Sequence, residues 1–480
     1  MKFRLTVLIV FSLCLSNVFA DEGMWLLGNL RKNKQTDRVM KELGLQMPVN
    51  KIYDPKKPCL ADAVVSFGGF CSGVVVSEDG LVFTNHHCGF SSIQQHSSVE
   101  HDYLKDGFYA RSLEEELPNP ELYVRFLLRT EDVTKRVLSA TRHAKTETER
   151  RVAVDSIMNV ISMEVSEKDS TLTGIVDAYY AGNEFWLSVY RDYNDVRLVF
   201  APPSSVGKFG WDTDNWMWPR HTGDFSVFRV YAGPDNKPAD YAPENRPYKA
   251  EKFLKISLGG YDEGDFAMIM GFPGSTQRYM TSYEIDRLLE VENPQRIFIR
   301  GERQAILKED MAASAKVRIQ YASKYAQSSN YWKNSIGKSR GIRRLDVKGR
   351  KQEQEAAFTA WAAKNTLPTE GYSNALNLIR ESVEETAPYF ASSQYLSEAI
   401  GRSVEILAPA RLAVSKKGGE LTEALKAFYK DYNMPTDRRV AKRMFRIVGE
   451  NCKELPSVFA EVIGKRFGGD TDAYVDYLYD

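Results

Sequence analysis

The chain has 480 residues, too many for one hydrophobic core, and this length predicts two or three domains. Its 64 basic residues balance its 64 acidic residues, so the formal net charge at pH 7 is zero. Such a chain carries neither the electrostatic footprint of a nucleic-acid binder nor a polybasic membrane patch. We therefore expect no nucleic-acid partner.

The N-terminus has the layout of a secretory signal peptide. Lys2 and Arg4 precede an apolar stretch from Leu5 to Leu15, and small and polar residues follow up to Ala20. This order predicts cleavage after Ala20, and the apolar stretch is too short to cross a bilayer. No later stretch approaches the roughly 18 uninterrupted apolar residues of a membrane helix. We expect an exported, periplasmic protein without a membrane span, and a secreted or cell-surface location also fits.

Export permits disulfides, which changes how the cysteines are interpreted. Cys14 would leave with the signal peptide, and Cys59, Cys71, Cys88 and Cys452 would remain. Four cysteines in so long a chain are no disulfide scaffold, and no C-x-x-C pair indicates structural zinc. We expect at most one or two local disulfides and no metal.

Residues 61–273 are patterned mostly as strands and turns. The segment CSGVVVSEDGLVFTNHHC predicts a hairpin with a strand at 73–77, a turn at 78–80 and a return strand at 81–85. We predict two further short strands, GDFSVFRVYAG at 223–233 and GDFAMIMGFPG at 264–274.

Two stretches are patterned as helices instead. Between the hairpin and the later strands, apolar residues recur at helical spacing from Glu131 to Val165, which predicts a helical insertion. After Gly274 helical patterning persists to the last residue, with breaks near SIGKSRG (335–341) and NTLPTEGYSN (365–374). Thr281 and Glu284 fit a capping box at the start of this helical part.

The segment Thr84-Asn85-His86-His87-Cys88 has the features of a hydrolase base. A hydrolase that activates a serine needs an imidazole held where a strand meets a loop, and a carboxylate that fixes its tautomer. Asp224 opens the strand predicted at 223–233 and can supply that carboxylate. In chymotrypsin-like proteins the base lies in a T-x-x-H-C context, and that cysteine pairs with one near the start of the preceding strand.

Thr84, His87 and Cys88 fill these places, and Cys71 opens the same hairpin. A tight hairpin would bring the two sulfur atoms within bonding distance. This similarity points to His87 as the base, Asp224 as the orienting acid and a disulfide between Cys71 and Cys88.

Other interpretations stay open at this point. Adjacent histidines are often structural, and a zinc site would need a third ligand and commonly H-x-x-x-H spacing on a helix. The nucleophile is missing, because the sequence contains no G-x-S-G-x-P segment. Ser275 in GFPGSTQRY lacks the glycine after the serine, so we do not favour it as the nucleophile.

Six segments closely resemble one family, the bacterial exported dipeptidyl aminopeptidases of the dipeptidyl-peptidase 7 and 11 type. They are GMWLLGNL, FTNHHCGF, HDYLKDGFYARSLEEELPNPEL, FAPPSSVGKFGWDTDNWMWPRHTGDFSVFRVYAGPDN, GFPGSTQRYMTS and KYAQSSNYWKNSIGKSRG.

The resemblance implies a mixed β and α fold, a chymotrypsin-like double β-barrel with a large all-α domain inserted in the second barrel. After a signal peptide at 1–20, residues 21–276 would be the N-terminal part of the barrel domain, and 277–480 the inserted domain. It also implies a serine-type aminopeptidase that releases dipeptides from oligopeptides with a free N-terminus, needs no cofactor and forms homodimers.

The family's base and orienting acid fall on His87 and Asp224, in agreement with the choice made from the residues. Its ligands for the substrate's α-amino group fall on Asn215, Trp216 and Asn330. A free ammonium needs acceptor oxygens in a closed end of the cleft, and Asn and backbone carbonyls can supply them.

The sequence departs from the family in length. Members are considerably longer, and the part absent here carries the serine, the last strands and the residue that sets preference at the cleaved bond. We therefore expect an inactive fragment with an incomplete second barrel, and a subtype closer to dipeptidyl-peptidase 7. One alternative is a non-catalytic pseudopeptidase that binds peptide N-termini. The other, a metal-dependent hydrolase using His86 and His87, ranks last.

Overall fold

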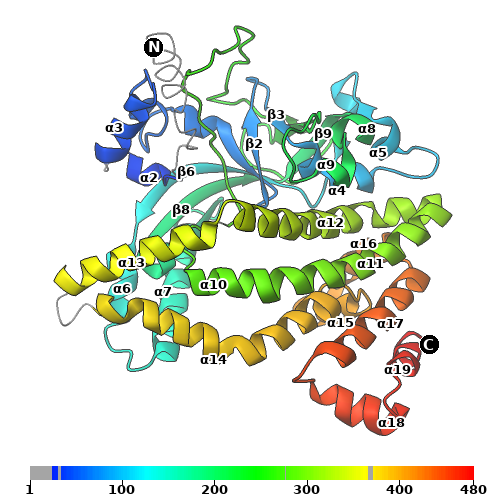
Figure 1. Ribbon diagram of the computed structural model, residues 1–480. Coiled ribbons are helices and arrows are strands. Elements are labelled where there is room, and N and C mark those ends of the chain that lie inside the picture. Colours follow the sequence, from blue (N-terminus) through cyan, green and yellow to red (C-terminus); the bar gives the residue numbers. More distant parts are fainter. Residues whose placement is uncertain (1–23, 31–33, 276, 366–370) are drawn as a thin grey trace, which may run out of the picture.

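The computed structural model describes residues 24–30, 34–275, 277–365 and 371–480. The predicted signal peptide, residues 1–20, lies outside the described residues. Figure 1 shows two layers, with the β-sheet in the upper half and long helices packed beneath it. The predicted mixed β and α fold is therefore confirmed.

The eleven described strands form one antiparallel sheet in the order β4-β9-β10-β3-β2-β1-β6-β8-β7, with β11 paired to β10 and β5 to β9. Their bounds are β1 Val64–Phe67, β2 Cys71–Val75, β3 Leu81–Thr84, β4 Phe108–Tyr109, β5 Leu117–Pro118, β6 Val124–Asp132, β7 Leu172–Tyr179, β8 Glu184–Tyr193, β9 Asp195–Ala201, β10 Ser226–Ala232 and β11 Arg246–Pro247.

The α-helices are α2 Leu27–Leu30, α3 Lys34–Glu42, α4 His86–Gln95, α5 Tyr103–Asp106, α6 Thr134–Ala140, α7 Glu147–Lys168, α8 Ser204–Gly207, α9 Trp211–Asp214, α10 Ser282–Arg287, α11 Asn293–Ala313, α12 Ala315–Arg344, α13 Val347–Asn365, α14 Ala375–Tyr395, α15 Leu407–Ser415, α16 Gly418–Lys430, α17 Met434–Asn451, α18 Lys465–Phe467 and α19 Thr471–Tyr479. Three π-helical turns, η5 Leu288–Glu292, η7 Leu396–Gly401 and η8 Phe459–Gly464, interrupt the helical part.

The predicted hairpin is confirmed as β2 and β3, which pair antiparallel with Gly73 opposite Thr84. Gly80 ends the turn at φ +68°, a left-handed conformation that favours glycine. A Cβ there would also lie 2.8 Å from the backbone oxygen of Val230, so the turn packs tightly against β10. The predicted strand at 223–233 is confirmed as β10.

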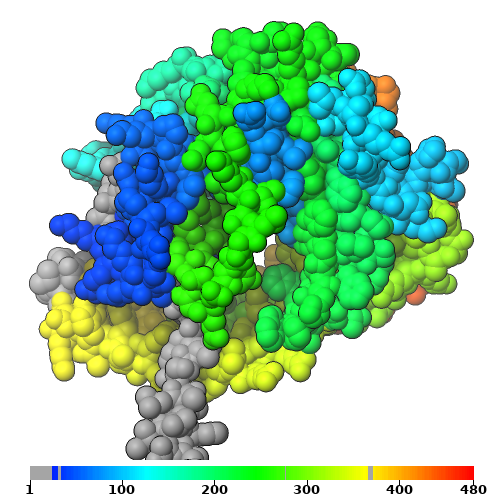
Figure 2. Space-filling model, turned by 90° about the horizontal axis from the view of Figure 1, so that it is seen from above, coloured from blue at the N-terminus to red at the C-terminus, as the bar shows by residue number. Residues whose placement is uncertain are grey.

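The prediction of a strand at 264–274 is wrong. Residues 248–275 and 277–281 contain no helix or strand, and Figure 2 shows this part of the chain lying on the surface of the upper face. Leu258, Tyr261 and Ile269 are almost completely exposed. An apolar run becomes a strand only when a neighbouring strand accepts its backbone hydrogen bonds, and no described strand pairs with this segment.

The predicted helical insertion is confirmed as α6 and α7 between β6 and β7, although Glu131 and Asp132 still belong to β6. Val137, Ile161 and Val165 of these helices pack on strands β7 and β8. The insertion therefore covers one end of the sheet with an apolar helical face.

The helical layer begins with the predicted capping box, in which the Thr281 side chain accepts from the Glu284 amide and the Glu284 side chain accepts from the Thr281 amide. The break predicted at 335–341 is wrong, since α12 continues to Arg344. Gly337 faces Trp216, whose Cβ would make an ordinary contact of 3.5 Å with an added Cβ. The break at 365–374 is confirmed by the end of α13 at Asn365.

Each layer has its own core. The sheet core includes Val65, Phe67, Val82, Phe228 and Val230, and the helical core includes Ile299, Leu307, Tyr321, Val440 and Met444. A division of the chain between residues 276 and 277 stays a prediction. Among the described residues, no helix is long and apolar enough to cross a membrane.

Candidate active site

The site lies where the end of β3 and the start of β10 meet, at one end of these two neighbouring strands. These strands pair antiparallel, with Thr84 opposite Ser226. The residues just after β3 and just before β10 are therefore neighbours, although Asp224 and His87 are 137 positions apart. Strand register thus brings the two predicted residues close together.

His87 does not stand where a strand meets a loop, as predicted, but in the first turn of α4. The predicted disulfide between Cys71 and Cys88 is present and ties this turn to the start of β2. A Cβ at Gly89 would lie 2.7 Å from the Ser226 hydroxyl oxygen, so only glycine allows α4 to approach β10 this closely. The helix start is fixed on two sides.

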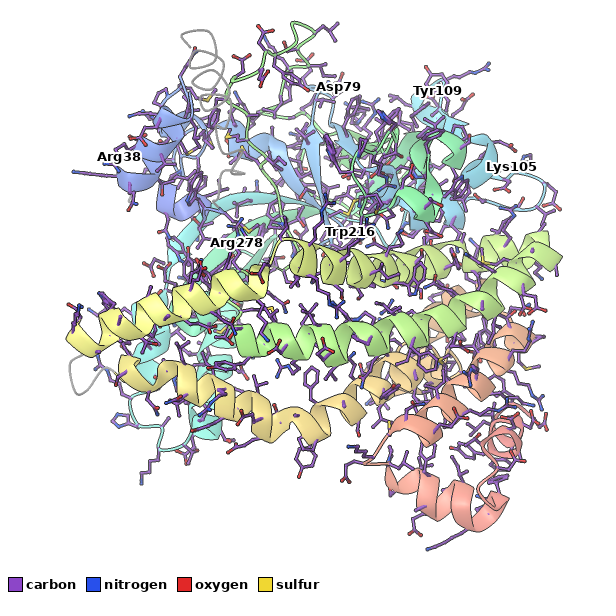
Figure 3. All side chains as sticks on the ribbon, viewed as in Figure 1. Arg38, Asp79, Lys105, Tyr109, Trp216 and Arg278 are labelled. Carbon is purple, nitrogen blue, oxygen red and sulfur yellow. A yellow bond between two sulfur atoms is a disulfide. The ribbon has the colours of Figure 1, made fainter. Side chains whose placement is uncertain are left out.

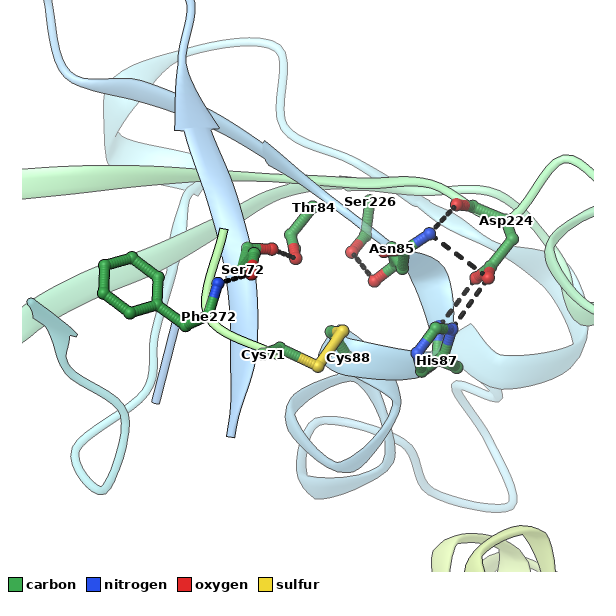
Figure 4. Close-up of a disulfide and its surroundings, with 9 residues drawn as sticks. All are labelled: Cys71, Ser72, Thr84, Asn85, His87, Cys88, Asp224, Ser226 and Phe272. Atoms are coloured by element: carbon green, nitrogen blue, oxygen red, sulfur yellow. Dashed lines mark hydrogen bonds and ion pairs between the residues drawn. A yellow bond between two sulfur atoms is a disulfide. The ribbon is translucent and has the colours of Figure 1, made fainter. Parts of the chain in front are cut away.

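Asp224 holds His87 by two bonds (Figure 4). Its Oδ2 lies 2.7 Å from Nδ1 of the imidazole, and its Oδ1 accepts from the His87 backbone N–H at 2.9 Å. The Asn85 side-chain amide donates to the Asp224 backbone oxygen at 3.1 Å and to Oδ2 at 3.3 Å. An Nδ1–H that donates to a carboxylate leaves the Nε2 lone pair of the neutral ring free to accept a proton.

The surroundings of Asp224 favour the ionised form of its carboxyl group. Its partial burial alone raises the pKa, but the hydrogen bonds and charge of His87 outweigh this and hold the pKa below its ordinary value. The His87 side chain is 68% exposed and its partner 20% exposed, so the imidazole is accessible while its carboxylate is sheltered. This arrangement suits a base with an orienting acid.

His86 lies in a different environment from His87, because it is buried. Its side chain is 1% exposed, and burial lowers its pKa to about 4, so the ring is neutral at pH 7. Its Nε2 is buried, and among the described residues no group with the spacing of metal ligands joins His86 to His87.

The metal hydrolase interpretation also fails on the chemistry of its donors. Within the described part of the chain, one group has the spacing of metal ligands, Cys71, His87 and Cys88, whose ligand atoms lie within 4.8 Å of one another. The two sulfur atoms are bonded to each other and supply no thiolate, which is the form that binds zinc.

The three predicted amine-binding residues meet beside α12. The Asn215 side-chain amide donates to Oδ1 of Asn330 at 3.0 Å, and the indole N–H of Trp216 donates to the same oxygen at 3.0 Å. Oδ1 of Asn215 accepts from Arg220 at 3.1 Å. Figure 3 shows Trp216 just above α12, between the two layers.

Trp216 has φ +58°, which is uncommon for a bulky residue and marks a backbone held by its surroundings. Two contacts from α12 hold this part of the chain. The Tyr325 hydroxyl donates to Asp212 at 3.0 Å, and the Lys333 ammonium donates to the Thr213 backbone oxygen at 3.2 Å. The sequence offered no signal for these contacts, nor for Asn85.

Comparison with known proteins places the chain in a family. The family model described as Peptidase S46 matches residues 20–480. The chain is 46% identical over 468 residues to dipeptidyl-peptidase 7 of Porphyromonas gingivalis, covering 96% of this chain and 65% of that protein. It is 47% identical over 494 residues to dipeptidyl-peptidase 7 of Porphyromonas endodontalis, covering 100% of this chain and 59% of that protein.

A third relative, the Asp/Glu-specific dipeptidyl-peptidase of Porphyromonas gingivalis, is 39% identical over 505 residues, covering 100% of this chain and 69% of that protein. Among solved structures, DPP11 of Porphyromonas endodontalis in complex with the dipeptide Arg-Glu has a TM-score of 0.84 and 36% identity, covering 95% of this chain and 68% of that one. The chain thus spans about two thirds of its relatives' length, and it belongs to the Peptidase S46 family.

Proposed function

We propose that this chain forms part of a serine-type dipeptidyl-peptidase, a hydrolase that releases dipeptides from the free N-termini of oligopeptides. The observation that carries the proposal is the 2.7 Å contact between Nδ1 of His87 and Oδ2 of Asp224. Relatives named dipeptidyl-peptidase 7 support the peptidase class.

In this proposal Nε2 of His87 removes the proton of a serine hydroxyl as it attacks the peptide carbonyl, and then returns that proton to the leaving amine. Asp224 orients the ring and stabilises the imidazolium. The 480 residues contain no G-x-S-G-x-P segment. We therefore propose that the serine lies in a part of the protein other than these 480 residues, and we expect the chain alone to be inactive.

The proposal includes the chymotrypsin-like double barrel, with the first barrel built from the described sheet. The exposed apolar side chains of Leu258, Tyr261 and Ile269 support it, because soluble proteins rarely leave such a run uncovered. In a second barrel this segment would pair with further strands. The all-α region would be the inserted domain.

Asn215, Trp216 and Asn330 are the proposed ligands of the substrate's ammonium group. In the structure Oδ1 of Asn330 already accepts two hydrogen bonds, and that of Asn215 accepts one. An incoming ammonium, which donates three, would take over some of these acceptors or use the Trp216 backbone oxygen. A closed end formed here would limit cleavage to two residues.

The remaining proposals concern preference and context. We place the subtype nearer to dipeptidyl-peptidase 7, supported by 46% identity to that enzyme against 39% to the Asp/Glu-specific one from the same organism. We further propose export to the periplasm, from the signal-peptide pattern, and a homodimer for the complete protein.

The deciding experiment is to sequence the source DNA beyond codon 480, express the longest reading frame and assay it on dipeptidyl chromogenic amides. We expect cleavage of substrates with a free amino terminus, none of their N-acetylated forms, and loss of activity in His87→Ala and Asp224→Asn. If the folded product binds free N-termini without cleaving, the chain is a pseudopeptidase and these catalytic roles are wrong.

A further inference from the structure

The first of the two adjacent histidines, His86, is not used by the proposed chemistry, and its surroundings indicate a separate role. His86 points into the base of the segment between β9 and β10, residues 202–225, which we name the β9–β10 loop. This loop carries Asn215 and Trp216 in its middle and Asp224 at its end. One loop thus supplies both the orienting acid and two proposed amine ligands.

The ring of His86 is fitted to the start of this loop. The backbone of Pro202 interacts with the ring and offsets part of the pKa lowering by burial, and the buried Nε2 has no hydrogen-bond partner. A Cβ added to Gly207 would overlap the ring carbons and lie 2.8 Å from Nδ1. Phe90 packs against the ring edge-on, with centroids 5.6 Å apart.

The two ends of the loop are joined directly beside this contact. The backbone N–H of Gly223 donates to the Val206 oxygen at 3.0 Å, and the Thr222 hydroxyl donates to the Gly207 oxygen at 3.2 Å. Asp224 follows immediately. These two hydrogen bonds therefore connect the start of the loop to the residues next to the carboxylate.

We propose that His86 is a positioning residue that fixes the start of the β9–β10 loop while His87 and Asn85 fix its end. Three consecutive residues at the start of α4 then hold both ends of one loop. This explains why two adjacent histidines have opposite environments, one 1% exposed and the other largely exposed. The consequence for amine binding rests on the proposed function, but the effect on Asp224 does not.

The test uses the 480-residue chain and two readouts. The first is the downfield proton resonance of the His87 Nδ1–H, which reports its bond to Asp224 whether or not the chain is part of a peptidase. The second is calorimetric affinity for a tetrapeptide with a free amino terminus. His86→Phe keeps an aromatic ring without the nitrogens that can interact with Pro202, and Gly207→Ala keeps the imidazole but places a methyl group in its space.

We expect both variants to lose or broaden the resonance and to weaken peptide binding at least tenfold. His86→Asn, which keeps a side-chain N–H that can interact with Pro202, should restore most of the resonance. The matched control is His96→Phe, which changes a histidine at the other end of α4 that bonds Asn119 at 3.2 Å. It should keep the resonance and leave the affinity within twofold.

The proposal is overturned if His86→Phe and Gly207→Ala both retain the wild-type resonance. If His86→Phe does not fold, the contact between the His86 ring and Gly207 can still be tested. Gly207→Ala should weaken the resonance in the wild type but not in a His86→Ala background. Equal losses in the two backgrounds would contradict it. If the variants change the resonance as expected while the chain binds no peptide, that result would support the positioning role of His86 and contradict the proposed function.

Discussion

Thr84 of β3 lies opposite Ser226 of β10, and this pairing sets the distance between His87 and Asp224. A shift of the register by one residue would turn every side chain of β10 to the other face and carry the carboxylate away from the imidazole. The Ser226 hydroxyl also donates to the Asn85 backbone oxygen at 2.9 Å, which fastens the strand end to the helix start.

Asp224→Asn should remove the acceptor for the Nδ1–H of His87 and leave the imidazole in the wrong tautomer. In the complete enzyme we expect kcat to fall by about 10⁴-fold, with KM nearly unchanged, because the side chain orients the base and does not bind peptide. Steady-state kinetics on a dipeptidyl amide measure this. A loss of less than tenfold would contradict the orienting role.

Replacing both Cys71 and Cys88 by serine should lower the free energy of unfolding by about 3 kcal/mol, because a link across 17 positions restricts the unfolded chain. Urea unfolding of oxidised and reduced protein measures the difference. The control is the reductant itself, which should destabilise the wild type and leave the double variant unchanged. A reductant effect in both would point to another cause.

His86 should make the free energy of unfolding depend on pH. The unfolded chain binds a proton at this histidine below about pH 6.5, whereas burial lowers the folded pKa to about 4. The stabilisation is therefore complete above pH 6.5 and is lost as pH falls toward 4, by about 3 kcal/mol. Unfolding free energies of wild type and His86→Asn between these pH values should diverge by this amount. Parallel curves would show that the ring is not buried as a neutral group.

Asn330→Ala should weaken binding of a peptide's free amino terminus by tenfold or more. It removes an acceptor, leaves the Asn215 amide without its partner and leaves the Trp216 indole N–H with the Asn330 backbone oxygen as its remaining acceptor. Calorimetry with free and N-acetylated peptide measures it. The acetylated peptide should bind the wild type and the variant equally poorly. If Asn330→Ala binds the free peptide normally, α12 has no part in amine recognition.

Leu258→Ser with Ile269→Ser should reduce self-association of the chain without changing its thermal unfolding, because both side chains are fully exposed. Light scattering and a melting curve measure the two quantities. Phe67→Ser, a change in the fully buried sheet core, is the contrasting variant and should lower Tm by many degrees. A drop in Tm for the surface pair would mean that the segment packs against the molecule.

The sequence correctly predicted features that depend on neighbours along the chain. Alternating apolar residues with a turn glycine at Gly80 predicted the β2–β3 hairpin, and Thr281 with Glu284 predicted the start of α10. These follow from local φ/ψ preferences and from hydrogen bonds within a few residues. The closeness of His87 and Asp224 was also predictable, because each lies within three residues of the end of a strand that its own pattern marks.

Tertiary structure alone decided the rest. The apolar run at 264–274 is no strand because no described strand pairs with it. Helix α12 continues through Gly337, where glycine costs about 1 kcal/mol, because the buried Ser335 and Ser339 on either side bond to side chains of α11. The inward position of His86 and the meeting of Asn215 with Asn330, 115 positions away, depend on how the β9–β10 loop lies between sheet and helices. Local pattern does not specify such contacts, since they form only when separate elements have packed together.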